Sequence, residues 1–330
     1  MGAGAAGSLT LAAAGGGSPT LATIDVGTNT TLLLVARVAD GGALTVLDER
    51  AEITRLGRGI GTTGALGEAG IAATLDVLRG YADIARRHGA RVAAIGTEGL
   101  RRASNARAFL DPARAILGAE VAVIDGEREA ALTFRAVTAS FPALARADAP
   151  LAVVDIGGGS TEIIAARRGD VRLRTSLPIG SVRLTERHIR RDPPEARELA
   201  AARAEVAGAL GGVDLAAALS GGGVATLVGV AGTVTTLAAM AQDLTAYDPA
   251  RVHGFTLTRA ALDAQIARLA RSTQSEREKM PGLDPRRADV ILAGALVLRA
   301  IVEATGAASV LVSDRGIRWG LLYEMSATAP

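Results

Sequence analysis

One short pattern occurs twice in the chain and constrains its fold more than any other feature. Residues 24–36 read IDVGTNTTLLLVA, and residues 154–166 read VDIGGGSTEIIAA. In both copies an apolar strand carries an Asp near its end, a Gly-containing turn with a hydroxyl side chain follows, and the chain returns into an apolar run. This repeat predicts a duplicated α/β domain. Two such domains leave a cleft between them, which is a favoured place for ligands.

The elements expected around each copy alternate between strand and helix. Apolar runs predict the strands, and apolar residues at helical spacing predict the helices. The first half has expected strands at 21–26, 32–36, 91–96 and 121–125, a loop at 57–67, and helices at 68–88, 104–117 (broken near Pro112) and 126–140. The second half has expected strands at 151–155, 161–166, 171–177, 224–232 and 309–316, and helices at 181–190, 195–211, 233–242, 287–304 and 317–325.

This pattern divides the chain into four segments. A Gly/Ala-rich stretch over 1–20 predicts a flexible tail, and the polar segment 141–150 with two prolines predicts a linker. The first α/β domain is expected over 21–140 and the second over 151–330. The sequence RRGD at 167–170 has the spacing of a two-residue hairpin, which favours antiparallel pairing there.

Composition excludes several classes of protein. The chain of 330 residues has no cysteine, so disulfides, thiolate nucleophiles and thiolate metal sites are excluded. The histidines His88, His188 and His253 are scattered, which disfavours a zinc site. A net charge of +2 gives no indication of nucleic acid. We find neither a signal-peptide pattern nor an apolar run of membrane-spanning length, so the expected location is cytoplasmic, without a membrane partner.

The repeated turns have the chemistry of a phosphate site. Glycine allows the backbone to approach a ligand, successive N–H groups form an anion-binding concavity, and hydroxyls add donors. An Asp near the strand end is placed to hold Mg²⁺, usually through water. A third small-residue turn, GVAGTVTT at 229–236, strengthens this interpretation. A Walker loop is excluded because the only lysine, Lys279, precedes Met280, and the GxGxxG matches at 2–7 and 59–64 lack the required strand-to-helix context.

Several motifs together resemble one family, the exopolyphosphatase/guanosine pentaphosphate phosphatase (Ppx/GppA) family. They occur in the family's order and cover about residues 21 to 325: IDVGTNT, GTEGLRRASN, IDGEREA, VDIGGGSTE, PIGSVRLTE, GVAGTVTT and SDRGIRWGLLYE. The resemblance implies a duplicated actin-like fold, of the acetate kinase, sugar kinase, Hsp70 and actin group. The chain is similar to the family's short members, which lack the C-terminal HD-type domain.

The resemblance also implies roles for individual residues. Glu129 in IDGEREA matches the family's general base, whereas Glu127 does not; from the residues alone, both are acidic residues in the first turn of a helix, which its dipole favours. Asp25, Asp155 and Glu162 are the expected carboxylates for Mg²⁺, possible alternatives being other divalent cations. The expected phosphate-binding residues are Gly27, Thr28, Asn29, Arg101, Asn105, Gly157, Gly158, Gly159, Ser160, Gly232 and Thr233.

The expected function is Mg²⁺-dependent hydrolysis of terminal phosphate from inorganic polyphosphate, by a phosphoric anhydride hydrolase. Phosphoryl transfer of this kind needs positioning, charge neutralisation and an oriented water more than covalent chemistry. Hydrolysis of guanosine pentaphosphate to tetraphosphate is the close alternative, because the terminal chemistry is the same. A kinase with an adenosine pocket near SDRGIRWG and a non-catalytic sensor of phosphate chains are the others. The resemblance further suggests a homodimer.

Three arginine clusters were candidates for following an extended polyanion beyond the cleft. They are Arg86–Arg87, Arg167–Arg168, and Arg187 with Arg190–Arg191. Solvated surface arginines are the commoner explanation for each cluster. A row of arginines leading away from the cleft would distinguish a binding surface from a solvated one.

Overall fold

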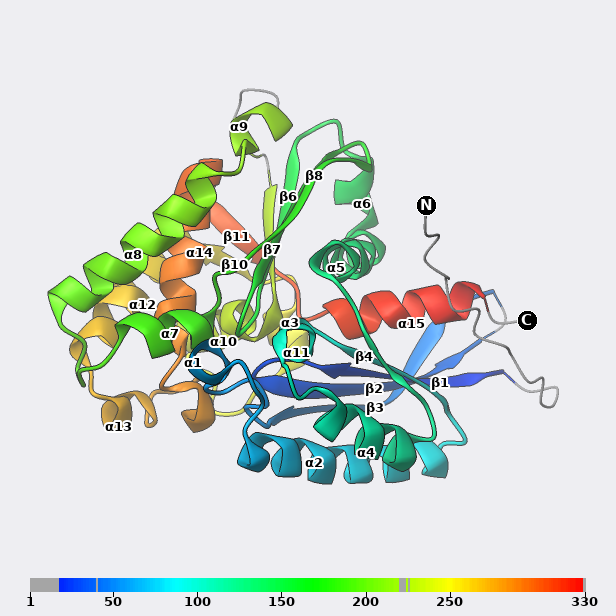
Figure 1. Ribbon diagram of the computed structural model, residues 1–330. Helices are drawn as coiled ribbons and strands as arrows, with labels where there is room; N and C mark the ends of the chain where they lie inside the picture. Colours follow the sequence, from blue (N-terminus) through cyan, green and yellow to red (C-terminus); the bar gives the residue numbers. More distant parts are fainter. Residues whose placement is uncertain (1–17, 40, 220–223, 225, 329–330) are drawn as a thin grey trace, which may run out of the picture.

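The computed structural model describes residues 18–39, 41–219, 224 and 226–328, and its core is two β-sheets from the two halves of the chain (Figure 1). The expected flexible tail lies outside the described residues up to position 17. The first sheet has the order β3-β2-β1-β4-β5. Its strands are β1 (Thr20–Val26), β2 (Thr30–Val38), β3 (Leu44–Ile53), β4 (Arg91–Gly96) and β5 (Val121–Val123).

The second sheet has six strands in the order β10-β11-β9-β6-β7-β8. They are β6 (Leu151–Ile156), β7 (Thr161–Arg167), β8 (Asp170–Leu177), β9 (Thr226–Val230), β10 (Thr256–Thr258) and β11 (Ser309–Val312). The antiparallel hairpin expected at RRGD is confirmed, since Arg167 pairs with Asp170. Arg168 and Gly169 between them both have positive φ, as the favoured two-residue hairpin turn requires.

The repeated sequence folds as two hairpins with the same register. Asp25 of β1 lies opposite Leu32 of β2, and Asp155 of β6 lies opposite Glu162 of β7. In each hairpin the Asp strand also pairs in parallel with a strand on its other side, β4 or β9. The repeat is therefore a repeat of structure, and the strand-end Asp occupies the same position in both sheets.

Helices cover the outer faces of both sheets. The first sheet is covered by α2 (Glu68–Arg87) and α4 (Arg107–Leu117), and the second mainly by α8 (Ala196–Gly211), α10 (Ala231–Ala241), α12 (Arg259–Arg271) and α14 (Ile291–Thr305). The remaining helices are short: α1 (Ile60–Thr63), α3 (Glu98–Arg102), α6 (Pro142–Arg146), α7 (Ser181–His188), α9 (Leu215–Ala218), α11 (Pro249–Val252), α13 (Gln274–Arg277) and the 3-10 turn Pro285–Arg287.

Two helices, α5 (Gly126–Ser140) and α15 (Ile317–Ala327), cross between the halves (Figure 1). The helix α5 belongs to the first half but packs on β6, β7 and β8, whereas α15 closes the chain and packs on β1 and β2. The two helices also pack on each other. Each sheet is thus covered by a helix from the other half, so both halves are needed to build the centre of the molecule.

A few predicted boundaries were wrong, for local reasons. The helix expected from 104 begins at Arg107 and runs through Pro112 without a break, because the stripe Phe109, Ala113 and Leu117 is buried against the first sheet. The strand expected over 224–232 ends at Val230, and α10 begins at Ala231. The helix expected from 287 begins at Ile291, after a 3-10 turn. Short helices occupy part of the expected loop (α1) and the expected linker (α6).

None of the helices in the described part of the chain is both long enough and apolar enough to cross a membrane.

The crossing of α5 and α15 gives a first prediction. A Cβ at Gly320 would lie 2.0 Å from the Leu132 carbonyl oxygen, so Gly320→Ala must push the two helices apart. We expect a loss of about 1–3 kcal/mol in the free energy of unfolding, measured by urea denaturation. Gly80→Ala in α2 is the matched control, since nothing lies within 4 Å of its added Cβ. Alanine should stabilise that helix by about 0.5–1 kcal/mol. A neutral Gly320→Ala would contradict the close crossing.

Candidate active site

A cavity of about 530 Å³ lies between the two halves, where the repeated hairpins meet. The turns of both hairpins and the first turn of α10 line it. The predicted site residues that line this cleft are Asp25, Gly27, Thr28, Asn29, Glu129, Asp155, Gly157, Gly158, Gly159, Ser160, Glu162, Gly232 and Thr233. Residues far apart in the sequence therefore converge on one cleft.

The two turns are held in the same way. The Gly27 N–H donates to the Thr30 carbonyl at 3.0 Å, and the Gly157 N–H donates to the Ser160 carbonyl, also at 3.0 Å. The amide nitrogen Nδ2 of Asn29 is buried without a hydrogen-bond partner among the described residues. A buried donor without a partner costs free energy, so it is placed to receive an anionic ligand.

Four buried carboxylates form the floor of the cleft: Asp25, Glu129, Asp155 and Glu162. Asp155 and Glu162 are direct cross-strand neighbours, so their side chains share one face of the sheet. The Thr133 hydroxyl of α5 donates to Asp155 at 2.9 Å, and the Ser176 hydroxyl of β8 donates to Glu162 at 2.7 Å. One oxygen of Asp25, Oδ1, is buried without a hydrogen-bond partner among the described residues.

Burial dominates the electrostatics of these groups. It raises the pKa of Asp25 to about 7, helped by the charge of Asp155 and opposed by Arg318. It raises the pKa of Asp155 to about 6, opposed by the Thr133 hydrogen bond. Burial also raises the pKa of Glu162 well above its usual range, with the charges of Glu129 and Asp155 adding to the shift. A cluster of this kind favours protons or a bound cation.

Glu129 lies in the first turn of α5, which points at the cleft. The Asp125 carboxylate caps the helix by accepting from the Arg128 N–H at 2.8 Å. Arg101 donates to Glu129 Oε1 at 2.6 Å. Burial raises the pKa of Glu129 to about 8, although the hydrogen bond and the charge of Arg101 oppose this. A carboxylate with its pKa near neutrality matches the needs of a general base.

The neighbouring glutamate faces another way. The Glu127 side chain is 63% exposed and pairs with Arg174 at 3.1 Å, whereas the Glu129 side chain is only 4% exposed. The two residues lie on different faces of the same helical turn. The chain therefore carries its own matched control for any role of Glu129.

The chemistry of the floor fits a divalent cation, although no ready-made metal cluster is present. Carboxylates are the ligands that Mg²⁺ prefers, and it commonly keeps several waters and binds through one or two carboxylates plus phosphate oxygens. Among the described residues no group of three Asp, Glu or His side chains has gathered to hold a metal ion. The partnerless Asp25 oxygen and the raised carboxylate pKa values fit a cation that arrives with water and substrate.

Asn105 does not lie at the cleft. Its carbonyl oxygen accepts from the Leu66 N–H at 2.8 Å, and its amide donates to the Leu66 carbonyl at 3.0 Å. The structure thus gives Asn105 the task of fixing the loop before α2, and it does not line the cavity. Arg101 does not line the cavity either, but it contacts the cleft through Glu129.

The third turn is shaped by an arginine that sequence reasoning missed. Arg287 donates to the Thr30 hydroxyl at 3.1 Å, and its guanidinium fills the space where a Cβ at Gly232 would lie. Ala231 beside it adopts φ 69°, a strained conformation for a residue other than glycine. Arg287 lines the cleft, and no local motif marks it, because its partners Thr30 and Gly232 are distant in the sequence.

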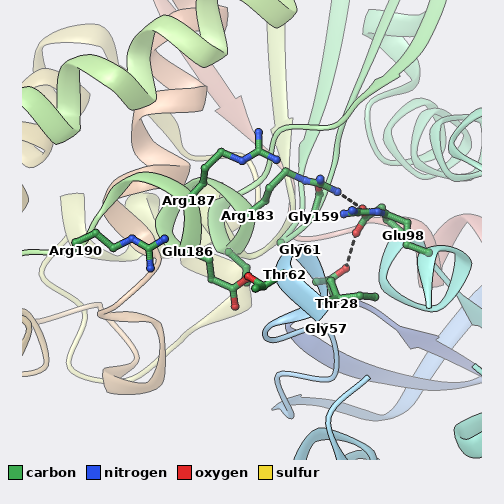
Figure 2. Close-up of a pocket in the computed structure, with 14 residues that line it drawn as sticks. Thr28, Gly57, Gly61, Thr62, Glu98, Gly159, Arg183, Glu186, Arg187 and Arg190 are labelled. Carbon is green, nitrogen blue, oxygen red and sulfur yellow. Dashed lines mark hydrogen bonds and ion pairs between the residues drawn. The ribbon is translucent and has the colours of Figure 1, made fainter. Parts of the chain in front are cut away.

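Two further residues were missed in spite of lying in recognised motifs. Arg318 of SDRGIRWG lines the cleft, pairs with Glu49 and lowers the pKa of Asp25. Glu98 of GTEGLRRASN is buried where the two hairpin turns touch. It accepts from the Thr28 hydroxyl at 3.5 Å and pairs with Arg183 of α7, so it joins the two halves (Figure 2). The motifs alone gave these residues no reason to be singled out.

Comparisons with known proteins agree on one family. The model of the Ppx/GppA phosphatase family matches residues 34–329. The exopolyphosphatase 2 of Mycobacterium tuberculosis is 38% identical over 323 residues, covering 93% of this chain and 98% of that protein. The structure is similar to the crystal structure of an Aquifex aeolicus family member, with a TM-score of 0.77, 34% identity, and coverage of 94% of this chain and 99% of that one.

A second solved structure supports the fold. A crystal structure of an exopolyphosphatase from Cytophaga hutchinsonii superposes with a TM-score of 0.85 at 28% identity, covering 94% of this chain and 99% of that chain. The expected fold class, a duplicated actin-like α/β architecture, is confirmed by these likenesses and by the two mixed sheets.

The buried carboxylates predict how stability depends on pH without metal. The pKa of Asp25 is raised from 3.8 to about 7 in the folded protein, so ionisation there opposes folding once the pH exceeds about 4. In EDTA, Asp25→Asn should therefore exceed the wild type by about 2–4 kcal/mol in unfolding free energy at pH 8, and by much less at pH 4.5. Urea denaturation at both pH values measures this.

The control for this prediction is Asp76→Asn, at a carboxylate of α2 that is 75% exposed. We expect it to change stability by less than about 0.5 kcal/mol at either pH. An Asp25→Asn effect of equal size at both pH values would show that the substitution acts through packing and not through ionisation.

Proposed function

The chain belongs to the Ppx/GppA phosphatase family, and from this premise we propose that it hydrolyses the terminal phosphate of inorganic polyphosphate by base-activated water. The observation that carries the proposal is Glu129, a buried carboxylate hydrogen-bonded to Arg101 in the same cleft as two phosphate-type turns. The 38% identity to an exopolyphosphatase supports polyphosphate as the substrate.

In this proposal each part of the cleft has one task. The turn N–H groups and the Asn29 amide hold the non-bridging oxygens of the terminal phosphate, and Arg287 adds charge at the wall. Glu129 accepts a proton from the attacking water, and Arg101 fixes the orientation of its carboxylate. Asp25, Asp155 and Glu162 hold Mg²⁺, directly or through water. When bound, the ion neutralises charge on the phosphoryl oxygens and orients the substrate.

The alternatives receive less support. A kinase would need an acceptor in place of water, whereas the base here lies at the floor of the cleft. A sensor of phosphate chains has no need of a buried, oriented glutamate. Guanosine pentaphosphate remains an alternative substrate to be compared directly, since its terminal phosphate presents the same chemistry. The homodimer and the cytoplasmic location stay predictions.

The role of Glu129 can be tested against its neighbour. Glu129→Gln should lower the rate of phosphate release from polyphosphate by about 10²–10⁴-fold, because the amide cannot accept the proton. Glu127→Gln, the same change at an exposed position two residues away, should stay within about twofold of wild type. Phosphate release is followed with polyphosphate and with guanosine pentaphosphate. Equal rates for Glu129→Gln and wild type would overturn the assignment, and release from guanosine pentaphosphate alone would change the substrate.

Metal removal tests the carboxylate floor separately. Chelation should reduce turnover to background, and added Mg²⁺ should restore it, because the charge on the substrate and on the floor is otherwise unbalanced. Glu162→Gln should raise the free Mg²⁺ needed for half-maximal activity by at least about tenfold. Glu127→Gln serves again as the control and should leave the Mg²⁺ requirement unchanged. An unaltered requirement in Glu162→Gln would remove that residue from the metal site.

A further inference from the structure

A second cavity, of about 130 Å³, lies behind the contact between the two hairpin turns. It shares Thr28, Gly158 and Gly159 with the cleft, so the two cavities meet at the tips of the turns. Its distinguishing feature is four arginines in its wall: Arg102, Arg183, Arg187 and Arg190 (Figure 2). We call it the arginine cavity.

Three of these arginines form a row that starts at the cleft. Arg183, Arg187 and Arg190 follow one another at intervals of four and three residues, on α7 and just beyond it, so they share one face. The inner member, Arg183, has a side chain only 10% exposed and donates to the Gly159 carbonyl at 2.8 Å. Arg187 is 51% exposed, and Arg190 is also exposed. The row therefore leads from the phosphate turn out to solvent.

The balance of charge in the arginine cavity is positive. Two glutamates line it beside the four arginines. Glu186 is engaged by the Gly59 N–H at 2.8 Å, and Glu98 is engaged by Arg183, Arg102 and Thr28. Within the described part of the chain, Arg190 makes no ion pair. Arginine forks suit phosphate oxygens, which can bind two donors at once.

The inner end of this cavity already accommodates an anion. Three donors from two halves of the molecule converge on the buried Glu98 carboxylate, directly beside Gly159. The volume equals that of about four liquid water molecules, which is room for one or two phosphate groups. Longer chains would extend along the exposed arginines.

We propose that the arginine cavity and the row Arg183, Arg187 and Arg190 bind the phosphates that follow the one being cleaved, and so determine the preference for long chains. This inference rests on the proposed function, because it takes polyphosphate as the ligand. A triphosphate ends inside the cleft, whereas a long chain reaches the row. Of the arginine clusters seen in the sequence, only the one at Arg187 and Arg190 lines a cavity that adjoins the cleft.

The test compares short and long substrates in two double variants. Arg187→Ala/Arg190→Ala should lower kcat/KM for long-chain polyphosphate at least tenfold more than for tripolyphosphate, through a higher KM. Arg167→Ala/Arg168→Ala is the matched control, since this pair bonds to Asp148 and lines neither cavity. It should leave both substrates within twofold of wild type. An equal loss on both substrates, or no loss on the long chain, overturns the inference.

A binding measurement separates this inference from the proposed function. Long-chain polyphosphate is titrated against Glu129→Gln protein with and without Arg187→Ala/Arg190→Ala, so that turnover plays no part. We expect at least tenfold weaker binding when the two arginines are removed. Equal affinities overturn the inference. Intact, arginine-dependent binding in a wild type that releases no phosphate would instead overturn the proposed function alone.

Discussion

The burial of four carboxylates at one point is the constraint on which the rest of the structure depends. Asp25, Asp155, Glu129 and Glu162 come from four different elements and meet between two sheets, where burial raises the pKa of each. Such a cluster opposes folding unless protons, arginines or a cation balance it. Arg101 and Arg318 supply part of that balance, and the remaining charge makes the cleft receptive to a cation with a phosphate chain.

The crossing of α5 and α15 explains how these groups come together. Because α5 leaves the first half and packs on the second sheet, Glu129 lies beside Asp155 and Glu162, and Thr133 on the next turn bonds to Asp155. In return, α15 lies on the first sheet and brings Arg318 towards Asp25. The base and the carboxylate floor are therefore coupled through packing, which makes the site a property of both halves at once.

The sequence predicted the parts of the site that sit inside local motifs. The two hairpins, their glycines and the strand-end aspartates follow from short-range pattern, because a strand–turn–strand unit encodes its own hydrogen bonds. Asn105 shows the limit of that reasoning: it belongs to a matching motif, yet the fold uses it to hold Leu66. Arg287 shows the opposite case, since its position depends on Thr30 and Gly232, which are far from it in the chain.

By itself the sequence determined the repeat, the two α/β halves and the identity of the acidic and phosphate-binding segments. These depend on apolar periodicity and turn chemistry, which act over a few residues. Only the tertiary structure decided which glutamate of α5 faces the cleft, which arginines line it, and that Arg183, Arg187 and Arg190 form a row leading from the phosphate turn. These are consequences of how two sheets and two crossing helices pack, and no short stretch of chain contains that information.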